Sequence, residues 1–259
     1  MSTTSAEDCG PGRTARYVAI ITDGNGRWAQ SRGLPVNDGH HAGADTLKAR
    51  LRDAVELGIE ELTVYSFSTE NWARPAEEVQ GLISMLAQRI ARETPGLHRA
   101  GVRMRFIGRR EGAPRELAEQ MYRSEALTAG NRLLSLFIAF NYGGRAEILD
   151  AARRFRGSTE EEFRHCLYAP DMHDPEVIIR TGGERRLSNY LPWQAAYSEL
   201  VFRDELWPDF TREDLMACLA EFNGRAHRLS LGTRLIVTRP RGWRRDGRPA
   251  AATRTNHPV

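Results

Sequence analysis

Short β-branched apolar runs alternate along this chain with longer stretches in which apolar residues recur every three or four positions. The runs predict strands at residues 17–22, 59–67, 102–107, 133–140, 177–179 and 200–202. The longer stretches predict helices at residues 28–32, 38–58, 75–90, 114–127, 144–155 and 211–222. Strands that alternate with helices indicate an α/β fold with a parallel central sheet flanked by helices. Ligands of such sheets bind at the carboxyl ends of the strands.

The first predicted strand runs directly into a glycine-rich turn, Asp23-Gly24-Asn25-Gly26-Arg27-Trp28, and a helical segment follows. A strand, a glycine turn and a helix N-terminus together favour a phosphate, because unpaired N–H groups and the helix dipole face the anion. Arg27 adds a cation, whereas Asp23 would repel the same anion. A divalent ion that prefers oxygen ligands, such as Mg²⁺, would bridge Asp23 and the phosphate. An ordinary surface turn is the alternative interpretation.

Three later polar clusters, at residues 68–74, 141–145 and 180–189, also follow predicted strands. The last cluster places Arg180, Arg185, Arg186 and Ser188 around two glycines. Arginine forks and a hydroxyl are suited to a polyanion, although a solvated surface loop is the alternative. Because this loop and the first glycine turn both favour phosphate and both end strands of one sheet, we expect two phosphate-bearing ligands side by side.

The formal charge of the 259-residue chain is only +3, and it is uneven. Residues 232–259 contain seven arginines and one aspartate, about +6, so the remainder carries about −3. The body of the chain therefore gives no electrostatic reason to expect a nucleic acid as a partner. The cysteines, Cys9, Cys166 and Cys218, are scattered, which suits a reducing cytosol and matches no metal-ligand spacing. No apolar run is long enough to span a bilayer and no signal peptide is recognised, so we expect a cytoplasmic protein.

Composition also divides the chain into three parts. With 41% hydrophobic residues overall, residues 17–231 provide enough material for a single domain with a large core. Residues 1–16 are small and polar, and residues 232–259 are rich in Arg, Pro and Gly, so we predict disorder at both ends. The arginines and Trp243 of the basic tail would give no more than a weak peripheral contact with an anionic membrane surface.

Six ordered motifs between Tyr17 and Arg228 resemble those of the cis-prenyltransferases, the undecaprenyl diphosphate synthase family. They are DGNGRW (23–28), GHHAG (39–43), FSTENWARP (67–75), NYGGR (141–145), RTGGERRLSNYLPWQ (180–194) and YSELVF (197–202). The resemblance implies a parallel sheet flanked by helices, with a hydrophobic tunnel between two helices and the sheet. It also implies a homodimer and a Mg²⁺-dependent transferase of isoprenoid biosynthesis, which condenses isopentenyl diphosphate with an allylic prenyl diphosphate.

The resemblance further implies roles for individual residues. Asp23 and Glu199 would hold Mg²⁺ with the diphosphates, and Asp23, Ser68 and Asn71 would be catalytic, with the base left unassigned. The allylic diphosphate would bind to Gly24, Asn25, Gly26, Arg27 and His40, and isopentenyl diphosphate to Arg180, Arg186 and Ser188. Trp72 and Arg74 would lie near the reacting carbons. Trp28 belongs to the same substrate-binding set, although core packing is the simpler interpretation of its side chain.

The sequence departs from the family pattern at Thr22, Val36 and Arg185, where methionine, arginine, and glutamine or histidine are usual, and in the fourth strand. There, Phe137 and Phe140 replace smaller or polar residues. They point to opposite faces of the strand, so at least one should face the tunnel and stop chain growth. We therefore predict a short-chain (Z)-prenyl diphosphate.

Ser66 weighs against a short product, because a small side chain leaves room for the first isoprene units. Three alternatives stay open at this point. They are a long-chain synthase of the undecaprenyl type, an irregular coupling of two allylic diphosphates, which Val36 and the phenylalanines motivate, and a non-catalytic subunit of the same fold. The last is disfavoured, because the residues of both phosphate loops are present.

Overall fold

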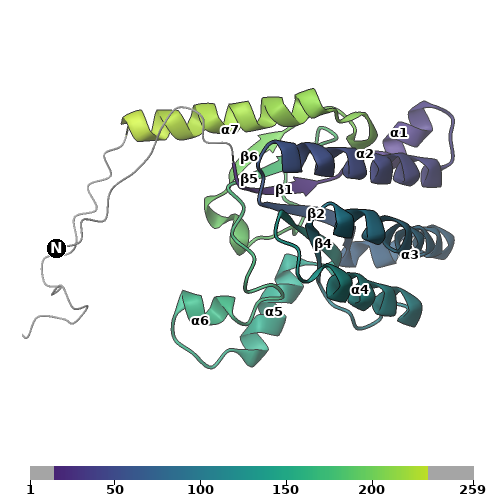
Figure 1. Cartoon of the computed structure of the whole chain (residues 1–259), viewed down its shortest axis with the longest axis horizontal. Coiled ribbons are helices and arrows are strands. Elements are labelled where there is room, and N and C mark those ends of the chain that lie inside the picture. Colours follow the sequence, from purple (N-terminus) through teal and green to yellow (C-terminus); the bar gives the residue numbers. More distant parts are fainter. Residues whose placement is uncertain (1–14, 233–259) are drawn as a thin grey trace, which may run out of the picture. The chain divides into compact units, whose positions relative to one another are not determined.

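Six strands form a single sheet in which all neighbouring strands run parallel. The computed structural model describes residues 15–232, with side chains up to Arg225 (Figure 1). The strands are β1 (Tyr17–Ile21), β2 (Glu61–Ser68), β3 (Val102–Ile107), β4 (Leu134–Tyr142), β5 (Val177–Arg180) and β6 (Glu199–Phe202). Their order across the sheet is β3-β4-β2-β1-β5-β6. The predicted α/β class is confirmed, and all six predicted strands are present with ends that differ by no more than two residues.

The predicted helices are present as well. The α-helices are α1 (Asn25–Ser31), α2 (Val36–Glu56), α3 (Ala76–Arg99), α4 (Arg115–Thr128), α5 (Gly144–Arg154), α6 (Glu160–Arg164) and α7 (Arg212–Gly232), and the 3₁₀ turns are η1 (Thr69–Ala73), η2 (Gln194–Tyr197) and η3 (Trp207–Asp209). Helix α3 continues past the predicted end, through Pro95. Helix α6 was not predicted, because its 5 residues are too few to show a period. The chain divides into two compact units, and the first of them ends at Asn223. All residues of the candidate site described below belong to this first unit.

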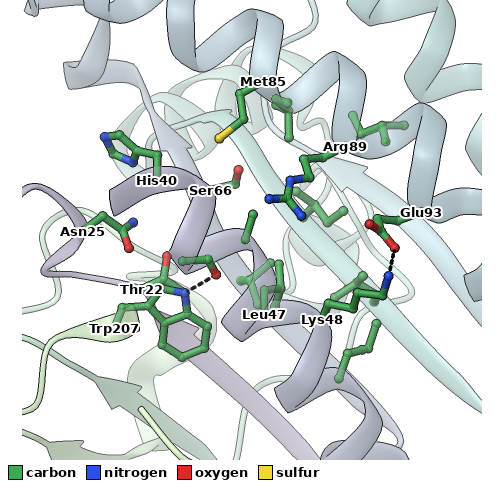
Figure 2. A pocket seen from close by; sticks show the side chains of 18 of the residues that line it. Thr22, Asn25, His40, Leu47, Lys48, Ser66, Met85, Arg89, Glu93 and Trp207 are labelled. Atoms are coloured by element: carbon green, nitrogen blue, oxygen red, sulfur yellow. Dashed lines mark hydrogen bonds and ion pairs between the residues drawn. The ribbon is translucent and has the colours of Figure 1, made fainter. Parts of the chain in front are cut away.

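Alternation along the strands divides their side chains between two faces of the sheet, each with its own hydrophobic cluster. Val18 and Ile20 of β1 belong to a cluster that α2, α3, α4 and the start of α7 cover. Ala19 and Ile21 belong to a second cluster, which is covered by the segment between α6 and β5 and by the loop after β5. Helices α2 and α3 contact each other on the first face. An apolar cavity lies between them and the sheet (Figure 2).

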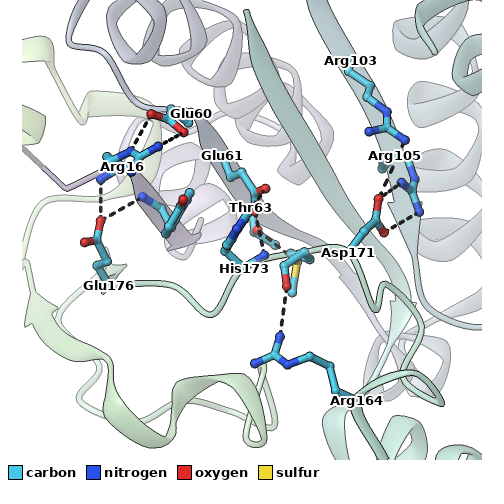
Figure 3. Close-up of polar contacts among 12 residues, drawn as sticks. Arg16, Glu60, Glu61, Thr63, Arg103, Arg105, Arg164, Asp171, His173 and Glu176 are labelled. Carbon is cyan, nitrogen blue, oxygen red and sulfur yellow. Dashed lines mark hydrogen bonds and ion pairs between the residues drawn. The ribbon is translucent and has the colours of Figure 1, made fainter. Parts of the chain in front are cut away.

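Polar contacts at the amino ends of the strands hold the chain segment that leads into β5 (Figure 3). Glu176 accepts a hydrogen bond from the backbone N–H of Arg16 at 2.5 Å. Glu61, the first residue of β2, lies 2.8 Å from Nδ1 of His173. The predicted phosphate loops lie at the carboxyl ends of the strands. The contacts at the amino ends therefore stabilise the sheet without occupying the end where a ligand would bind.

The ordered chain begins earlier than predicted. Ala15 is fully buried and Arg16 pairs with Glu60 at 2.5 Å, so the prediction of disorder is wrong for these two residues. At the other end, α7 includes Gly232, the first residue of the predicted tail. The rest of both predicted disordered segments, residues 1–14 and 233–259, lies outside the described residues. None of the described helices is long and apolar enough to cross a membrane.

Candidate active site

Asp23 follows β1 directly, at the carboxyl edge of the sheet, and forms two ion pairs there. Its Oδ2 lies 2.9 Å from Nη2 of Arg180, at the end of the neighbouring strand β5, and its Oδ1 lies 3.4 Å from Nη2 of Arg27 in α1. The hydroxyl of Thr181 fixes the Asp23 backbone, since it accepts from the N–H at 3.0 Å and donates to the carbonyl at 2.8 Å. The parallel pairing of β1 with β5 thus joins the two motifs that were predicted to bind phosphate.

The second glycine motif lets α2 approach the glycine turn closely. A Cβ on Gly39 would come within 2.1 Å of the backbone oxygen of Asn25, and a Cβ on Gly43 within 2.3 Å of Asn25 Oδ1. Only glycine therefore permits this packing of α2 against the N-terminus of α1. The close approach brings His40, which lies between the two glycines in the sequence, to the same pocket as Asn25.

The loop after β5 is built around Arg180, whose side chain is only 5% exposed. Its Nη1 donates to Ser188 Oγ at 2.7 Å and to the carbonyl oxygen of Arg186. The backbone of this loop has positive φ angles of 48°, 63° and 49° at Ser188, Asn189 and Leu191. Residues other than glycine rarely adopt such angles, which cost on the order of 1 kcal/mol each. Strain of this kind, held in place by surrounding contacts, is typical of ligand-binding loops.

The loop after β2 is linked to the end of β4. Asn71 Oδ1 accepts a hydrogen bond from the backbone N–H of Ser68 at 2.8 Å, which closes η1. Trp72 donates from Nε1 to Asn141 Oδ1 at 2.7 Å. The polar clusters after β1, β2, β4 and β5 therefore meet at one edge of the sheet, as the sequence predicted.

Two connected spaces lie at this edge. The first is a polar pocket of about 570 Å³, the cradle. It is lined by Ile21, Thr22, Asp23, Gly24, Asn25, Gly26, Arg27, Gln30, Val36, His40, Tyr65, Ser66, Ser68, Asn71, Arg74, Glu78, Leu82, Arg180 and Ser188. The second, the inner cavity, has a volume of about 150 Å³ and extends between α2, α3 and the sheet (Figure 2). Thr22, Asn25, His40, Ser66 and Leu82 line both spaces, so the cradle opens into the cavity.

His40 lies at the junction of the cradle and the inner cavity. Burial, and then the positive charge of Arg74, lower the pKa of His40 to about 4, so its imidazole is neutral at neutral pH. Within the described part of the chain, His40 Nε2, Asn25 Oδ1 and Arg180 Nε are buried without a hydrogen-bond partner. Buried polar atoms without partners are rare, and three of them around one cradle indicate a polar ligand.

The cradle brings together most of the predicted site residues. Eight predicted substrate-binding residues line it, namely Gly24, Asn25, Gly26, Arg27, His40, Arg74, Arg180 and Ser188, as do the predicted catalytic residues Asp23, Ser68 and Asn71.

Three predicted substrate-binding residues do not line the cradle. Arg186 pairs with Glu184, and its side chain is 62% exposed. Trp28 donates from Nε1 to Asp209 at 2.7 Å, outside the cradle. Trp72 is held by its bond to the end of β4, so it shapes the loop instead of facing the pocket.

Glu199 lies far from Asp23 within one chain. It is the first residue of β6 and lies level with Val177 and, across β5, with Val18. Asp23 follows Val18 by five residues, which at about 3.3 Å per residue is about 16 Å along the sheet. The prediction that Asp23 and Glu199 of the same chain share a Mg²⁺ ion is therefore wrong.

Phe137 and Phe140 do not line the inner cavity. Phe137 belongs to the cluster on the opposite face of the sheet, and the alternation of β4 turns Leu136 and Ile138 toward the cavity instead. Phe140 shares the cavity face, but it stacks on Phe67 with 5.4 Å between the ring centroids and is not part of the lining. The prediction that these phenylalanines narrow the tunnel is wrong, whereas Ser66 does line it.

The sequence did not assign a role to Thr181, which supports the cradle from behind Asp23, or to Tyr65, which lines it. Thr181 is fully buried and holds the Asp23 backbone. Its position directly after the predicted strand that ends near Arg180 could have indicated a role at the ligand site. Tyr65 lines the cradle from inside β2 and stacks on Tyr190 with 4.5 Å between the ring centroids. An aromatic residue inside an apolar strand carries no such signal.

The cradle fits a magnesium ion that is shared with a phosphate-bearing substrate. Among the described residues, no group of three or more His, Cys, Asp or Glu side chains could hold a metal by itself. Mg²⁺ does not need such a group, because it usually binds one or two carboxylates together with substrate phosphates and water. Asp23, whose side chain is 31% exposed, offers one carboxylate next to the arginines that suit the phosphates.

A polar cradle at the carboxyl ends of parallel strands, opening into an apolar cavity, suits a ligand with a charged head and a hydrocarbon tail. The chain belongs to the undecaprenyl diphosphate synthase family of cis-prenyltransferases, because the family model described as putative undecaprenyl diphosphate synthase matches residues 21–230. It is therefore a prenyltransferase, as the sequence motifs predicted.

Relatives and solved structures agree with this assignment. An isoprenyl transferase of Thermotoga maritima is 48% identical over 225 residues, which cover 83% of this chain and 97% of that protein. One of Caulobacter vibrioides is 47% identical, over 85% of this chain and 89% of that protein. Lavandulyl diphosphate synthase from Lavandula x intermedia, solved with dimethylallyl diphosphate, superimposes with a TM-score of 0.78 at 32% identity, over 81% of this chain and 95% of that chain. A probable undecaprenyl diphosphate synthase from Campylobacter jejuni gives a TM-score of 0.71 at 28% identity, over 82% and 97%.

Proposed function

We propose that this protein uses Mg²⁺ to condense isopentenyl diphosphate with an allylic prenyl diphosphate and releases a short-chain (Z)-prenyl diphosphate. The observation that supports this most is the opening of the polar cradle into the apolar inner cavity, at residues such as Asn25, His40 and Ser66. An allylic diphosphate has the same two parts, a charged head and a hydrocarbon tail. Its head suits the cradle and its tail suits the cavity.

In this mechanism, the turn from Gly24 to Arg27 and the neighbouring His40 hold the allylic diphosphate, while Arg180 and Ser188 hold isopentenyl diphosphate. Breaking the allylic C–O bond produces a carbocation and a pyrophosphate, whose negative charge Arg27 stabilises. Mg²⁺ held by Asp23 would add positive charge at the same oxygens. The double bond of isopentenyl diphosphate then attacks the carbocation, a C–C bond forms, and one proton leaves.

The group that accepts this proton has several candidates. Asp23 is the nearest carboxylate of the proposed reaction centre, and it is already paired with Arg180 at 2.9 Å. Ser68 and Asn71 line the cradle and would relay a proton through the Ser68 hydroxyl. The leaving pyrophosphate is the third candidate, since it gains negative charge in the same step.

A short product is supported by the size of the inner cavity and not by the phenylalanines of β4. At about 150 Å³, the cavity matches engineered protein cavities that hold a single benzene molecule. An isoprene unit has five carbon atoms, so the cavity has room for about one unit beyond the cradle. A long-chain product would need additional space.

A second candidate reaction is the irregular coupling of two allylic diphosphates. Val36, where many members of the family carry an arginine, lines the cradle and supplies no charge to a starter diphosphate. Lavandulyl diphosphate synthase, to which this chain is similar, was solved with an allylic diphosphate, dimethylallyl diphosphate. The four polar residues Asp23, Arg27, Arg180 and Ser188 all line the cradle, which argues against a non-catalytic subunit.

The protein is also proposed to act as a homodimer at a cytoplasmic site. Tyr197 is 99% exposed, and it lies two residues before the start of β6, which is an edge strand of the sheet. The unpaired backbone groups of an edge strand can pair with a second chain, and such pairing would cover the exposed ring of Tyr197. Sedimentation of the wild type and of Tyr197→Ser tests this, and a monomeric wild type would contradict it.

Mass spectrometry of reaction products tests the proposed function. Purified protein is incubated with Mg²⁺, isopentenyl diphosphate and a panel of allylic starters, and parallel reactions contain excess chelator or dimethylallyl diphosphate alone. We expect short (Z)-prenyl diphosphates that require both Mg²⁺ and isopentenyl diphosphate. Products from dimethylallyl diphosphate alone would favour irregular coupling, and products of undecaprenyl length would refute the short-chain proposal.

A further inference from the structure

An ion pair closes the far end of the inner cavity. Nζ of Lys48, in α2, lies 2.6 Å from Oε2 of Glu93, in α3. Figure 2 shows this pair at one end of the cavity and His40 and Asn25 at the other. The rest of the cavity lining near this end is largely apolar, with Leu51, Leu97 and Ile90 beside the two charges.

A second space lies behind this pair. It is a groove of about 500 Å³, the outer groove, bounded by α2, the end of α3 and the start of β3. Lys48, Glu93, Leu51 and Leu97 line both the inner cavity and the outer groove. The two spaces are therefore separated by the ion pair and two leucines. The outer groove is roughly three times as large as the inner cavity, for which the volume is about 150 Å³.

The two charges are held in place by further contacts. The Glu93 carboxylate, whose side chain is 18% exposed, also accepts from Nε of Arg92 at 3.0 Å. Burial alone would raise the pKa of Glu93, but the hydrogen bonds from Lys48 and Arg92 outweigh it and hold the pKa below its usual value. The carboxylate is therefore ionised at neutral pH. Arg89, one turn earlier in α3, lines the inner cavity and pairs with Asp45 of α2.

A hydrocarbon tail that reaches the pair cannot continue without separating it. An isoprene unit offers no hydrogen bond in exchange, and the displaced carboxylate would have to face an apolar chain. Chain growth from the cradle therefore meets a charged barrier at the point where the inner cavity ends.

We propose that the Lys48–Glu93 ion pair is the floor of the tunnel and limits the length of the product. This inference rests on the proposed elongation reaction and specifies which residues set its outcome. Removing the pair joins the inner cavity to the outer groove and allows additional isoprene units to be accommodated.

The test compares the product lengths of four proteins, which are the wild type, Lys48→Ala, Glu93→Ala and the double variant. Each is incubated with Mg²⁺, dimethylallyl diphosphate and excess isopentenyl diphosphate, and products are measured by mass spectrometry. We expect the main product to lengthen by at least one isoprene unit in the single variants and by more in the double variant. Lys48→Met keeps most of the side-chain volume without the charge, so it shows whether the charge or the bulk forms the barrier.

Asp45→Ala is the matched control. It also removes an ion pair between α2 and α3, but Asp45 lines neither space. Its product length should equal that of the wild type. Melting temperatures of all variants confirm folding, and we expect it to persist, because Lys48 is 44% exposed and Glu93 retains Arg92. Wild-type lengths in the double variant, or equal lengthening in Asp45→Ala, would overturn the proposal.

A binding measurement separates this proposal from the proposed reaction. Saturated n-alkyl diphosphates of increasing length are titrated calorimetrically into the wild type and the double variant. In the wild type, affinity should stop rising once the chain fills the inner cavity. In the double variant, affinity should continue to rise by about fourfold per added methylene. If the wild type fails to incorporate isopentenyl diphosphate, the proposed reaction is refuted. This titration still tests whether the Lys48–Glu93 pair is the floor of the tunnel. Identical length profiles in both proteins would refute the floor.

Discussion

Replacing Asp23 is expected to affect both catalysis and stability, because its carboxylate has two roles in the structure. It is the proposed metal ligand of the cradle, and it neutralises Arg180, whose side chain is only 5% exposed. In Asp23→Ala, the guanidinium stays buried without its carboxylate. It keeps two other acceptors, Ser188 Oγ at 2.7 Å and the carbonyl oxygen of Arg186.

The loss of stability can be estimated from these contacts. Breaking a fully buried ion pair by removing one partner costs about 3–5 kcal/mol. Asp23 is 31% exposed, and Arg180 retains two hydrogen bonds, so we expect a smaller cost of about 2 kcal/mol. For a domain of this size, that corresponds to a decrease in melting temperature of about 4–8 °C.

Asp23→Asn separates the two roles. The amide oxygen still accepts a hydrogen bond from Arg180, so about half of the lost stability should return. The neutral amide is a poor ligand for Mg²⁺, so turnover should stay at least about a hundredfold below the wild type in both variants. Glu184→Ala is the control, because it removes the exposed pair with Arg186 on the same loop and should change the stability by less than about 1 kcal/mol.

Thermal unfolding and steady-state turnover across a Mg²⁺ titration measure these effects. A melting temperature of Asp23→Ala equal to that of the wild type would show that the pair with Arg180 contributes nothing. Wild-type turnover in Asp23→Asn, or in the wild type with excess chelator, would refute the assignment of Asp23 as the metal ligand.

Three further predictions follow from the same geometry. Arg27→Ala should raise the Michaelis constant of the allylic substrate about ten- to a hundredfold, and Ser188→Ala should raise the Michaelis constant of isopentenyl diphosphate about fivefold. Arg186→Ala should change each of these two constants less than about threefold. Equal effects of Arg27→Ala and Ser188→Ala on both constants would contradict two separate sites. The free energy of unfolding should fall by about 3 kcal/mol as the pH decreases from 6.5 to 4, because His40, with a pKa of about 4 when folded, binds its proton mainly in the unfolded state over this range. Denaturant titrations at several pH values should show a weaker dependence of stability on pH for His40→Gln, and the same dependence as in the wild type would refute this. Phe137→Ala should destabilise the fold by about 3–5 kcal/mol, because it leaves a cavity in the second hydrophobic cluster. Product analysis should nevertheless find the wild-type chain length, and a longer product would show that Phe137 faces the tunnel.

Local patterns in the sequence were sufficient for the fold and for most of the cradle. Strand and helix periods depend on residues a few positions apart, so the six strands could be located within two residues. In a parallel sheet, all the residues that directly follow strands share one edge. The polar clusters at Asp23, Ser68, Asn141 and Arg180 could therefore be placed together before any contact was known.

Contacts between distant segments were decided only by the tertiary structure. Whether Phe137 faces the tunnel depends on which face of β4 the helices cover, and the alternation of side chains is the same in either case. The resemblance grouped Glu199 with Asp23 as a metal ligand, but the register of β6 places Glu199 level with Val18, toward the amino ends of the strands. Lys48 and Glu93 each look like an ordinary surface residue of an amphipathic helix. Only the packing of α2 against α3 brings them together across the end of the cavity, because the relative position of two helices is set by the core they share and not by the sequence of either one.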